Sequence, residues 1–301
     1  MLDGKGTPIT AEALKRLARL TGSAWLADGV ASMGAALAYY TLFSLAPLLL
    51  IVVSVAGLLF GHDAARGQIQ SQLSALMGDR GAAAVQDLLA SVDKPAQGSA
   101  ATALGVLLLL VGATTVFAEL QDALDRIWRV PARPAGSGWW ALLRARLLSF
   151  GMILALGFLL MVSLVASAVL STLQAWWNPM FGPWLDTAAL VNGVLGFVLV
   201  AACFAFVYKV MPRVHVAWHD VWTGALFTAV LFTLGKMLIG LYIGRSGVAS
   251  GFGAAGSLVA VLLWVYWSAQ IFLLGAEFTW VYANLYGSRR PLEDQTLVDS
   301  D

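Results

Sequence analysis

The sequence has few charged residues and a single cysteine, and its charge is close to balanced. Only 12% of the 301 residues are Asp, Glu, Lys or Arg, whereas a soluble globular chain has about 25%. The formal net charge of +1 predicts neither a nucleic-acid-binding surface nor an acidic partner. The one cysteine, Cys203, excludes an intrachain disulfide. No short apolar core with a small-residue cleavage site begins the chain, so we expect no removable signal peptide.

Long apolar runs are abundant instead. Hydrophobic residues make up 59% of the chain and the mean hydropathy is +0.79, which indicates a membrane protein. We place six spans at about 31–60, 101–118, 147–173, 188–210, 221–243 and 255–279. Each is expected to be helical, because an isolated strand leaves its backbone groups unpaired in lipid. The expected fold is an all-α, polytopic membrane bundle of six transmembrane helices, with one domain over residues 1–286.

Lys and Arg are distributed unevenly between the two ends of these spans. Thirteen lie in the N-terminal arm, in the loops after the second and fourth spans and near the C-terminus, against four on the opposite side. Positively charged residues accumulate on the cytoplasmic side of membrane proteins. Both termini are therefore expected in the cytoplasm.

Two segments outside the spans have helical periodicity. Residues 61–100 carry apolar residues at helical spacing on both sides of a Gly-Asp-Arg-Gly break at 78–81, which predicts two amphipathic helices on the outer surface. These helices either cap the bundle or bind a partner. The stretch LKRLARL at 14–20 predicts an interfacial helix with a basic face, and residues 287–301 are expected to form a polar cytoplasmic tail.

The first span carries a polar stripe. Tyr40, Ser44 and Pro47 fall on one face of a helical wheel. Lipid offers such side chains no hydrogen-bond partner, so this face is expected against other helices or a hydrated cavity. Pro47 cannot donate to the carbonyl of Phe43 and predicts a kink, which either improves packing or shapes a substrate path.

Two ionisable residues lie within or near the ends of later spans. Lys236 is expected about 10 Å from the outer end of the fifth span, and Glu277 near the inner end of the sixth. Their different depths argue against a direct pair. Lys236 either extends towards the outer headgroups or anchors an anionic group of a substrate. Glu277 either forms a structural ion pair or takes part in transport.

An inner charge cluster around Glu277 is expected, because further charged residues share its level in the membrane. They are Glu119, Asp122, Lys209, Arg213 and Asp220. A carboxylate at this depth needs a cation or water for stabilisation.

Motifs for catalysis and for metal binding are missing. The chain has no P-loop, no dinucleotide-binding glycine pattern after a strand and no nucleophile elbow, so we expect no enzyme and no cofactor. His215 and His219 are four residues apart, a spacing that places two ligands on one helical face, but a third ligand is not evident. No metal site is therefore predicted, and an interface with lipid headgroups is the favoured role for this pair.

Four stretches taken in order resemble the YihY/BrkB family of bacterial inner-membrane proteins. They are GAALAYYTLFSLAPLLLI at 34–51, FAELQDALDRIW at 117–128, VYKVMPRVHVAWHDVWTGAL at 207–226 and GSLVAVLLWVYWSAQIFLLGAEFTWVYA at 256–283. The resemblance implies a six-helix bundle in the bacterial inner membrane with a role in envelope biology. The sequence has FGAAGS at 252–257 where the family is expected to carry a tyrosine-glycine pair.

The sequence leaves three hypotheses for the function of this protein. The first is a transporter or flippase-like protein for an anionic lipid or amphipathic envelope component, with the first, fifth and sixth spans lining its path. The second is a non-transporting, virulence-associated envelope scaffold. The third is a ribonuclease, a historical label of the family, and it ranks last because the chain shows no metal cluster or acid–base pair near a basic groove. Membrane lipids are the expected partners, and no feature of the sequence supports a particular homo-oligomer.

Overall fold

The computed structural model describes residues 11–61, 115–131, 185–245 and 256–289, with scattered positions between 63 and 86. Its helices are α1 (Ala11–Ala27), α2 (Val30–Phe60), α6 (Leu185–Val210), α7 (Trp218–Arg245), α9 (Gly256–Leu285) and a helix over 115–127. Across these stretches no strand occurs. The described part is therefore all-helical, as the apolar runs predicted.

Three helices of the described part are long and apolar enough to cross a membrane. These segments are Gly193–Val210, Trp218–Tyr242 and Leu258–Leu285, and a shorter apolar segment covers Val30–Leu45. They correspond to four of the six predicted spans. The predicted span at 147–173 and most of the one at 101–118 lie outside the described residues, so the count of six stays a prediction.

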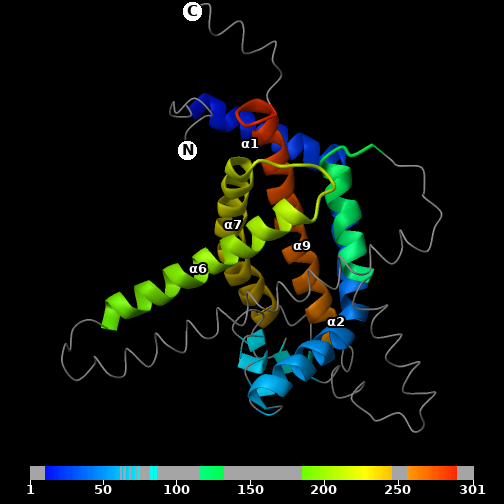
Figure 1. Ribbon diagram of the computed structural model, residues 1–301, viewed down its shortest axis with the longest axis vertical. Helices are drawn as coiled ribbons and strands as arrows, with labels where there is room; N and C mark the ends of the chain where they lie inside the picture. Colours follow the sequence, from blue (N-terminus) through cyan, green and yellow to red (C-terminus); the bar gives the residue numbers. More distant parts are fainter. Residues whose placement is uncertain are drawn as a thin grey trace, which may run out of the picture.

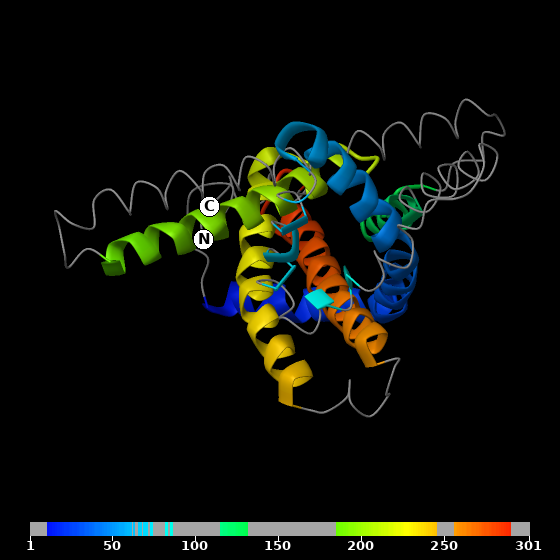
Figure 2. The ribbon, with the colours of Figure 1, turned by 90° about the horizontal axis from the view of Figure 1, so that it is seen from below.

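Helix α9 is the centre of the arrangement. It packs against α7 on one side and α2 on the other (Figures 1 and 2), and α1 crosses the end of the bundle where α9 finishes. Helix α6 packs on α7 at an angle, and its first half points away from the bundle in both views. The end at which α1 lies thus collects the start of α7, the end of α9 and the turn between α1 and α2.

Small residues let α9 approach its neighbours closely. A methyl group at Gly224 of α7 would overlap the side chain of Thr279, and one at Gly34 of α2 would overlap Gln270. At Gly240, by contrast, a methyl group would meet nothing within 4 Å. In a bundle whose surroundings are apolar, such close contacts are a main source of helix association.

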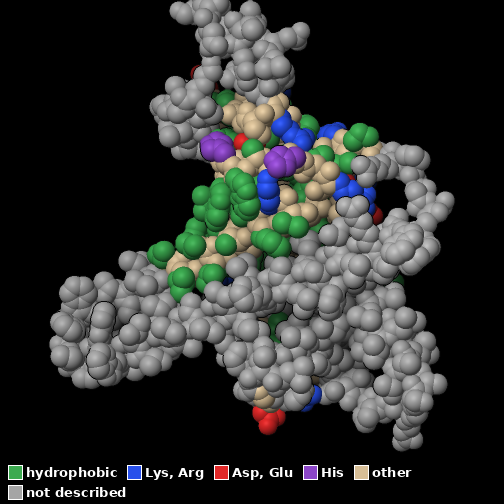
Figure 3. Space-filling view, in the orientation of Figure 1, with side chains coloured by type: hydrophobic (Ala, Val, Ile, Leu, Met, Phe, Trp, Pro, Cys, Tyr) green, Lys and Arg blue, Asp and Glu red, His purple; other side chains and the backbone are tan. Residues whose placement is uncertain are grey.

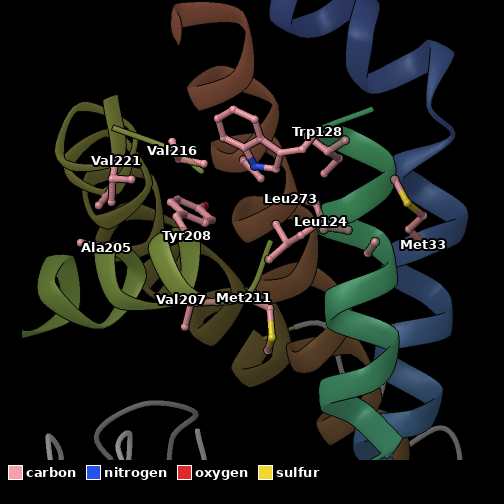
Figure 4. Close-up of a cluster of buried hydrophobic side chains, with 14 of the residues drawn as sticks. Met33, Leu124, Trp128, Ala205, Val207, Tyr208, Met211, Val216, Val221 and Leu273 are labelled. Carbon is pink, nitrogen blue, oxygen red and sulfur yellow. The ribbon is translucent and has the colours of Figure 1, made fainter. Parts of the chain in front are cut away.

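The largest buried cluster joins five elements at the α1 end of the bundle. Figure 4 shows Leu124 and Trp128 of the green helix facing Leu273 of α9, with Tyr208 and Met211 at the end of α6. The Tyr208 hydroxyl lies 3.0 Å from Thr228 Oγ1 and donates to the carbonyl of Phe272 at 2.6 Å. This polar contact is satisfied within the core and fixes α6 to both α7 and α9.

The described part of the outer segment packs inward. Val85 is fully buried against Val261 of α9, and Leu73 packs on the same cluster with Leu42 and Leu45 of α2. These contacts agree with the capping alternative for this segment. Its remaining residues lie outside the described part.

One face of α7 is apolar and exposed. Trp222, Leu226, Val230 and Leu234 follow each other at four-residue spacing and are all exposed, which is the pattern of a lipid-facing helix surface. Figure 3 shows hydrophobic side chains over α6 and α7, below a band of Lys, Arg and His near the end that carries α1. Apolar and charged surfaces are therefore separated along the bundle.

Candidate functional site

Glu277 is a buried carboxyl in the apolar helix α9. Its side chain is 0% exposed, and neither carboxylate oxygen has a hydrogen-bond partner among the described residues. Its neighbours are the Asp28 carboxyl and the Arg129 guanidinium. Ionisable groups in such surroundings are costly and usually functional, so this group is the candidate site.

Asp28 reaches the site because it lies in the turn between α1 and α2. The Asp28 N–H donates to the carbonyl of Ala24 at 2.9 Å, and Gly29 follows with a φ of +67°. This is a left-handed helix ending, which glycine adopts without steric cost. The turn holds the Asp28 side chain, which is buried, against α9.

Arg129 reaches the site from the end of the helix over 115–127. It has a φ of +54°, and the N–H of Val130 donates to the carbonyl of Asp125 at 2.9 Å. This ending normally takes glycine, and another residue pays about 1 to 2 kcal/mol for the conformation. The Arg129 Nη2 is 3.0 Å from Asp28 Oδ2, and the guanidinium lies 4.9 Å from the centre of the Trp280 ring.

The three ionisable side chains of Asp28, Arg129 and Glu277 do not have equal numbers of positive and negative charges. Two carboxyl groups, those of Asp28 and Glu277, face one guanidinium, and that guanidinium is half-exposed at the edge of the bundle. If both carboxyls are ionised, the group carries a net charge of −1. Such a site can hold a cation or a proton.

The predicted inner charge cluster is spread over separate contacts. None of its five residues, Glu119, Asp122, Lys209, Arg213 and Asp220, forms a hydrogen bond or ion pair with Glu277 in the described part. That these charges share the level of Glu277 in the membrane stays a prediction.

Arg213 pairs with the helix over 115–127. Its backbone N–H donates to Asp125 Oδ1 at 2.8 Å, and its Nε lies 3.3 Å from Asp125 Oδ2. Asp122 is a more distant and exposed partner at 3.9 Å. Burial raises the pKa of Asp125, and the hydrogen bond and charge of Arg213 oppose that rise.

Glu119 lies three residues, or one helical turn, before Asp122. Burial and the nearby Asp122 carboxylate raise the pKa of Glu119. Among the described residues its side chain forms no ion pair.

Asp220 ties the end of α9 to the start of α7. It is fully buried and accepts from the Ser288 N–H at 3.2 Å and from Ser288 Oγ at 2.6 Å. A methyl group at Gly287 would overlap its carboxylate, and Arg289 donates to the carbonyl of His215. The first residues of the predicted polar tail at 287–301 are therefore held by hydrogen bonds to Asp220 and His215.

Lys209 contacts groups close to it in the sequence. Its ammonium donates to the carbonyl of Val216 and lies 5.2 Å from the centre of the exposed Trp218 ring. An exposed Lys–Trp pair of this kind is typical of the membrane–water interface.

The two histidines do not share a helical face. Helix α7 begins at Trp218, so His219 is helical and His215 precedes the helix. In the described stretches no group of three His, Cys, Asp or Glu residues could hold a metal.

The polar stripe of the first span divides in α2. Ser44 is buried and donates to the carbonyl of Thr41 at 3.2 Å, whereas Tyr40 is exposed and meets the Tyr39 ring edge-on at 5.6 Å. The helix continues through Pro47, whose side chain lies outside the described part.

Lys236 is half-buried on α7, far from Glu277. Its neighbour Gly235 packs against Ile271, whereas Gly224 packs against Thr279. These contacts put Lys236 about ten residues, or roughly 15 Å, along α7 from the level of Glu277. The structure does not bring the two residues together.

Sequence reasoning missed Asp28, Asp125 and Arg129. Asp28 had one available signal, because Asp-Gly after an amphipathic helix marks a turn. Asp125 and Arg129 lie in a stretch without a recognisable ligand motif. Only their three-dimensional neighbours identify them.

Known proteins resemble this chain over most of its length. A UPF0761 membrane protein of Pseudomonas paraeruginosa is 29% identical over 90% of the chain and 63% of its own length. Others occur in Azotobacter vinelandii, 30% identical over 88% of the chain and 62% of the relative, and in Vibrio vulnificus, 28% identical over 88% and 82%. The chain thus spans less than two thirds of the Pseudomonas and Azotobacter relatives. No solved structure matches.

The family profile described as Virulence factor BrkB matches residues 21–297. This range contains α2, α6, α7 and α9 together with Asp28, Arg129 and Glu277. The chain therefore belongs to the BrkB virulence factor family of membrane proteins.

Proposed function

We propose that this protein is an inner-membrane transporter or flippase-like protein that moves an anionic lipid or an amphipathic envelope component. The observation that carries the proposal is Glu277, a fully buried carboxyl in an apolar helix without a hydrogen-bond partner among the described residues. Burying an ionisable group costs several kcal/mol unless it is compensated. A role in transport gives a reason to keep such a group.

Lys236 provides an anchor for the anionic part of the substrate. Its side chain is half-buried, and its neighbours Met237 and Leu238 are strongly exposed on the apolar surface of α7. A phosphate headgroup could pair with the ammonium while its acyl chains lie along the exposed apolar surface of α7 beside Met237. This arrangement favours an amphipathic substrate over a fully polar one.

The distribution of Lys and Arg supports an orientation of the bundle in the membrane. Contacts place Arg129, Arg213, Arg289, His215 and His219 at the end with α1. Figure 3 shows Lys, Arg and His side chains gathered there. In our proposal this end faces the cytoplasm, because Lys and Arg accumulate there. Glu277 then lies near the inner surface and Lys236 nearer the outer one.

Lipid translocation in proteoliposomes tests the proposal. The full chain is reconstituted with headgroup-labelled anionic or zwitterionic phospholipids, alongside Glu277→Gln and Lys236→Met. The exposed residues Glu12 and Lys15 of α1 supply matched controls, Glu12→Gln and Lys15→Met. We expect anionic lipid to move faster than in empty liposomes, with loss in the first two variants only. Equal rates with and without protein would refute passive flipping.

A second function is an envelope scaffold that does not transport. It is favoured by the family description, which names a virulence factor. A scaffold is expected to depend on its surface in the outer segment 61–100 and to tolerate Glu277→Gln. The scaffold would be favoured if the Glu277→Gln protein folds and maintains the cell envelope as well as the unmodified chain does.

A further inference from the structure

The buried carboxyls of Asp28 and Glu277 lie near the same guanidinium. Arg129 pairs with Asp28 at 3.0 Å and lies over the ring of Trp280, which is three residues, or one helical turn, after Glu277 on α9. Asp28 comes from the turn between α1 and α2, and Glu277 from the last third of α9. The side chains of both residues are buried, and both oxygens of Glu277 lack a donor in the described part. Carboxylates are acceptors only, so two of them can form a hydrogen bond only when one carries a proton.

We propose that Asp28 and Glu277 together hold one proton, which neutralises the buried group that they form with Arg129 and fastens the α1–α2 turn to α9. The inference deepens the proposed function and rests on it for the role of Glu277 in transport. The proton itself is a property of the pair and is measurable without transport.

Arg129 neutralises only one of the two carboxyls. Its Nη2 lies 3.0 Å from Asp28 Oδ2, and its guanidinium is half-exposed and also covers the Trp280 ring. A second cationic partner for Glu277 is not found among the described residues. One proton completes the balance.

The other charged groups at this end are directed elsewhere. On α1, Lys15, Arg16 and Arg19 are exposed. On α7, His219 and Asp220 lie 3.5 Å from each other, and Asp220 also accepts from Ser288.

The charged side chains at and after the end of α6 also have partners of their own. At the end of α6, Lys209 donates to Val216. Arg213 pairs with Asp125, and α2 carries no charged residue in its sequence; Gln270 of α9 donates to the α2 carbonyls of Val30 and Ala31.

A proton fits the site better than a metal ion. Hard cations such as Ca²⁺ take about six to eight oxygen ligands, and the described residues contain no cluster of three His, Cys, Asp or Glu side chains. A shared proton needs only the two facing carboxyl oxygens. The half-exposed Arg129 marks the edge at which the pair meets solvent.

Loss of the proton changes the contact between segments. Two adjacent carboxylates repel each other in surroundings of low polarity. The turn that carries Asp28 is formed at Gly29, which has a φ of +67°. Deprotonation therefore loosens α1 and the start of α2 from α9.

Infrared difference spectroscopy on the full chain in phosphatidylcholine nanodiscs tests the shared proton. Spectra are compared between about pH 5 and about pH 9, a range that spans the ordinary titration of exposed carboxyls and beyond. We expect one carboxylic-acid carbonyl band per chain that disappears as pH rises. The band is expected to be absent in Glu277→Gln, shifted in Asp28→Asn and unchanged in the exposed control Glu12→Gln.

The outcomes separate this inference from the proposed function. A band that is unchanged in both Glu277→Gln and Asp28→Asn overturns the shared proton, as does its displacement by sodium at constant pH. If Glu277→Gln does not fold, the shift in Asp28→Asn decides alone. A titrating band without lipid translocation supports the proton site and refutes flipping. Lipid translocation without such a band supports flipping and refutes the proton site.

Discussion

Gly224 of α7 lies directly against Thr279 of α9, so that a methyl group at position 224 would overlap the threonine side chain. Thr279 Oγ1 donates to the carbonyl of Gly275 at 2.6 Å, and Gly275 in turn lies against Thr228 of α7. Each helix thus offers a glycine to a threonine of the other. This reciprocal contact sets how closely α7 approaches α9.

Gly224→Ala is expected to destabilise the protein by about 1 to 3 kcal/mol, because the added methyl overpacks the contact with Thr279. Gly240→Ala is the matched control in the same helix. Open space surrounds Gly240, so this change is expected to be neutral or to stabilise by up to about 1 kcal/mol. Thermal unfolding in detergent compares the two, and equal shifts would contradict the close contact.

Arg129→Ala is expected to destabilise the protein more than Arg129→Gly, by about 1 kcal/mol. Both variants lose the contacts with Asp28 and Trp280, but only alanine keeps a Cβ at a φ of +54°. Denaturant unfolding measures the difference. The opposite order would show that the left-handed backbone carries no cost at this position.

Glu277→Gln is expected to rescue part of the stability lost in Arg129→Gly. Without the guanidinium, two buried carboxyls have no cationic partner among the described residues, and the amide removes one of them. A double-mutant cycle in thermal unfolding measures this coupling. Simple additivity of the two changes would indicate that Arg129 and Glu277 do not interact.

Asp125 contributes a pH dependence of defined sign. Its pKa in the folded protein is raised by burial, so the folded state binds this proton more tightly than the unfolded state. The contribution of Asp125 to stability therefore falls as pH rises from the ordinary value of 3.8 through the raised folded pKa.

Melting temperatures across the acidic range check this sign. Asp125→Asn is expected to remove that decrease, whereas Glu12→Gln, at an exposed carboxylate of α1, is expected to leave it unchanged. An identical pH profile in Asp125→Asn and the unmodified protein would contradict the assignment.

Ser288→Ala is expected to expose the chain after α9 to trypsin. Ser288 supplies two donors to the buried Asp220, and loss of the hydroxyl donor costs about 1 to 3 kcal/mol because it leaves a buried carboxylate under-satisfied. Faster cleavage after Arg289 or Arg290, followed by mass spectrometry, measures the release. Ser23→Ala, at an exposed serine of α1, is the control.

The sequence by itself determined the membrane class, the helical fold and the family. Apolar runs must form helices in lipid because backbone groups find no other partner there, and three such helices are long enough to span. Sequence also singled out Glu277, since a carboxyl within an apolar run is conspicuous without any structure.

Tertiary structure decided which groups meet Glu277. The depth of a residue along its helix is readable from the sequence, and it placed five charges near Glu277, but the rotation and neighbours of each helix are set by packing. Gly224 and Gly275 bring α7 against α9, and the Gly29 turn and the left-handed Arg129 deliver Asp28 and a guanidinium to the site. These contacts join residues about 50 or more positions apart, and local patterns extend over only a few residues.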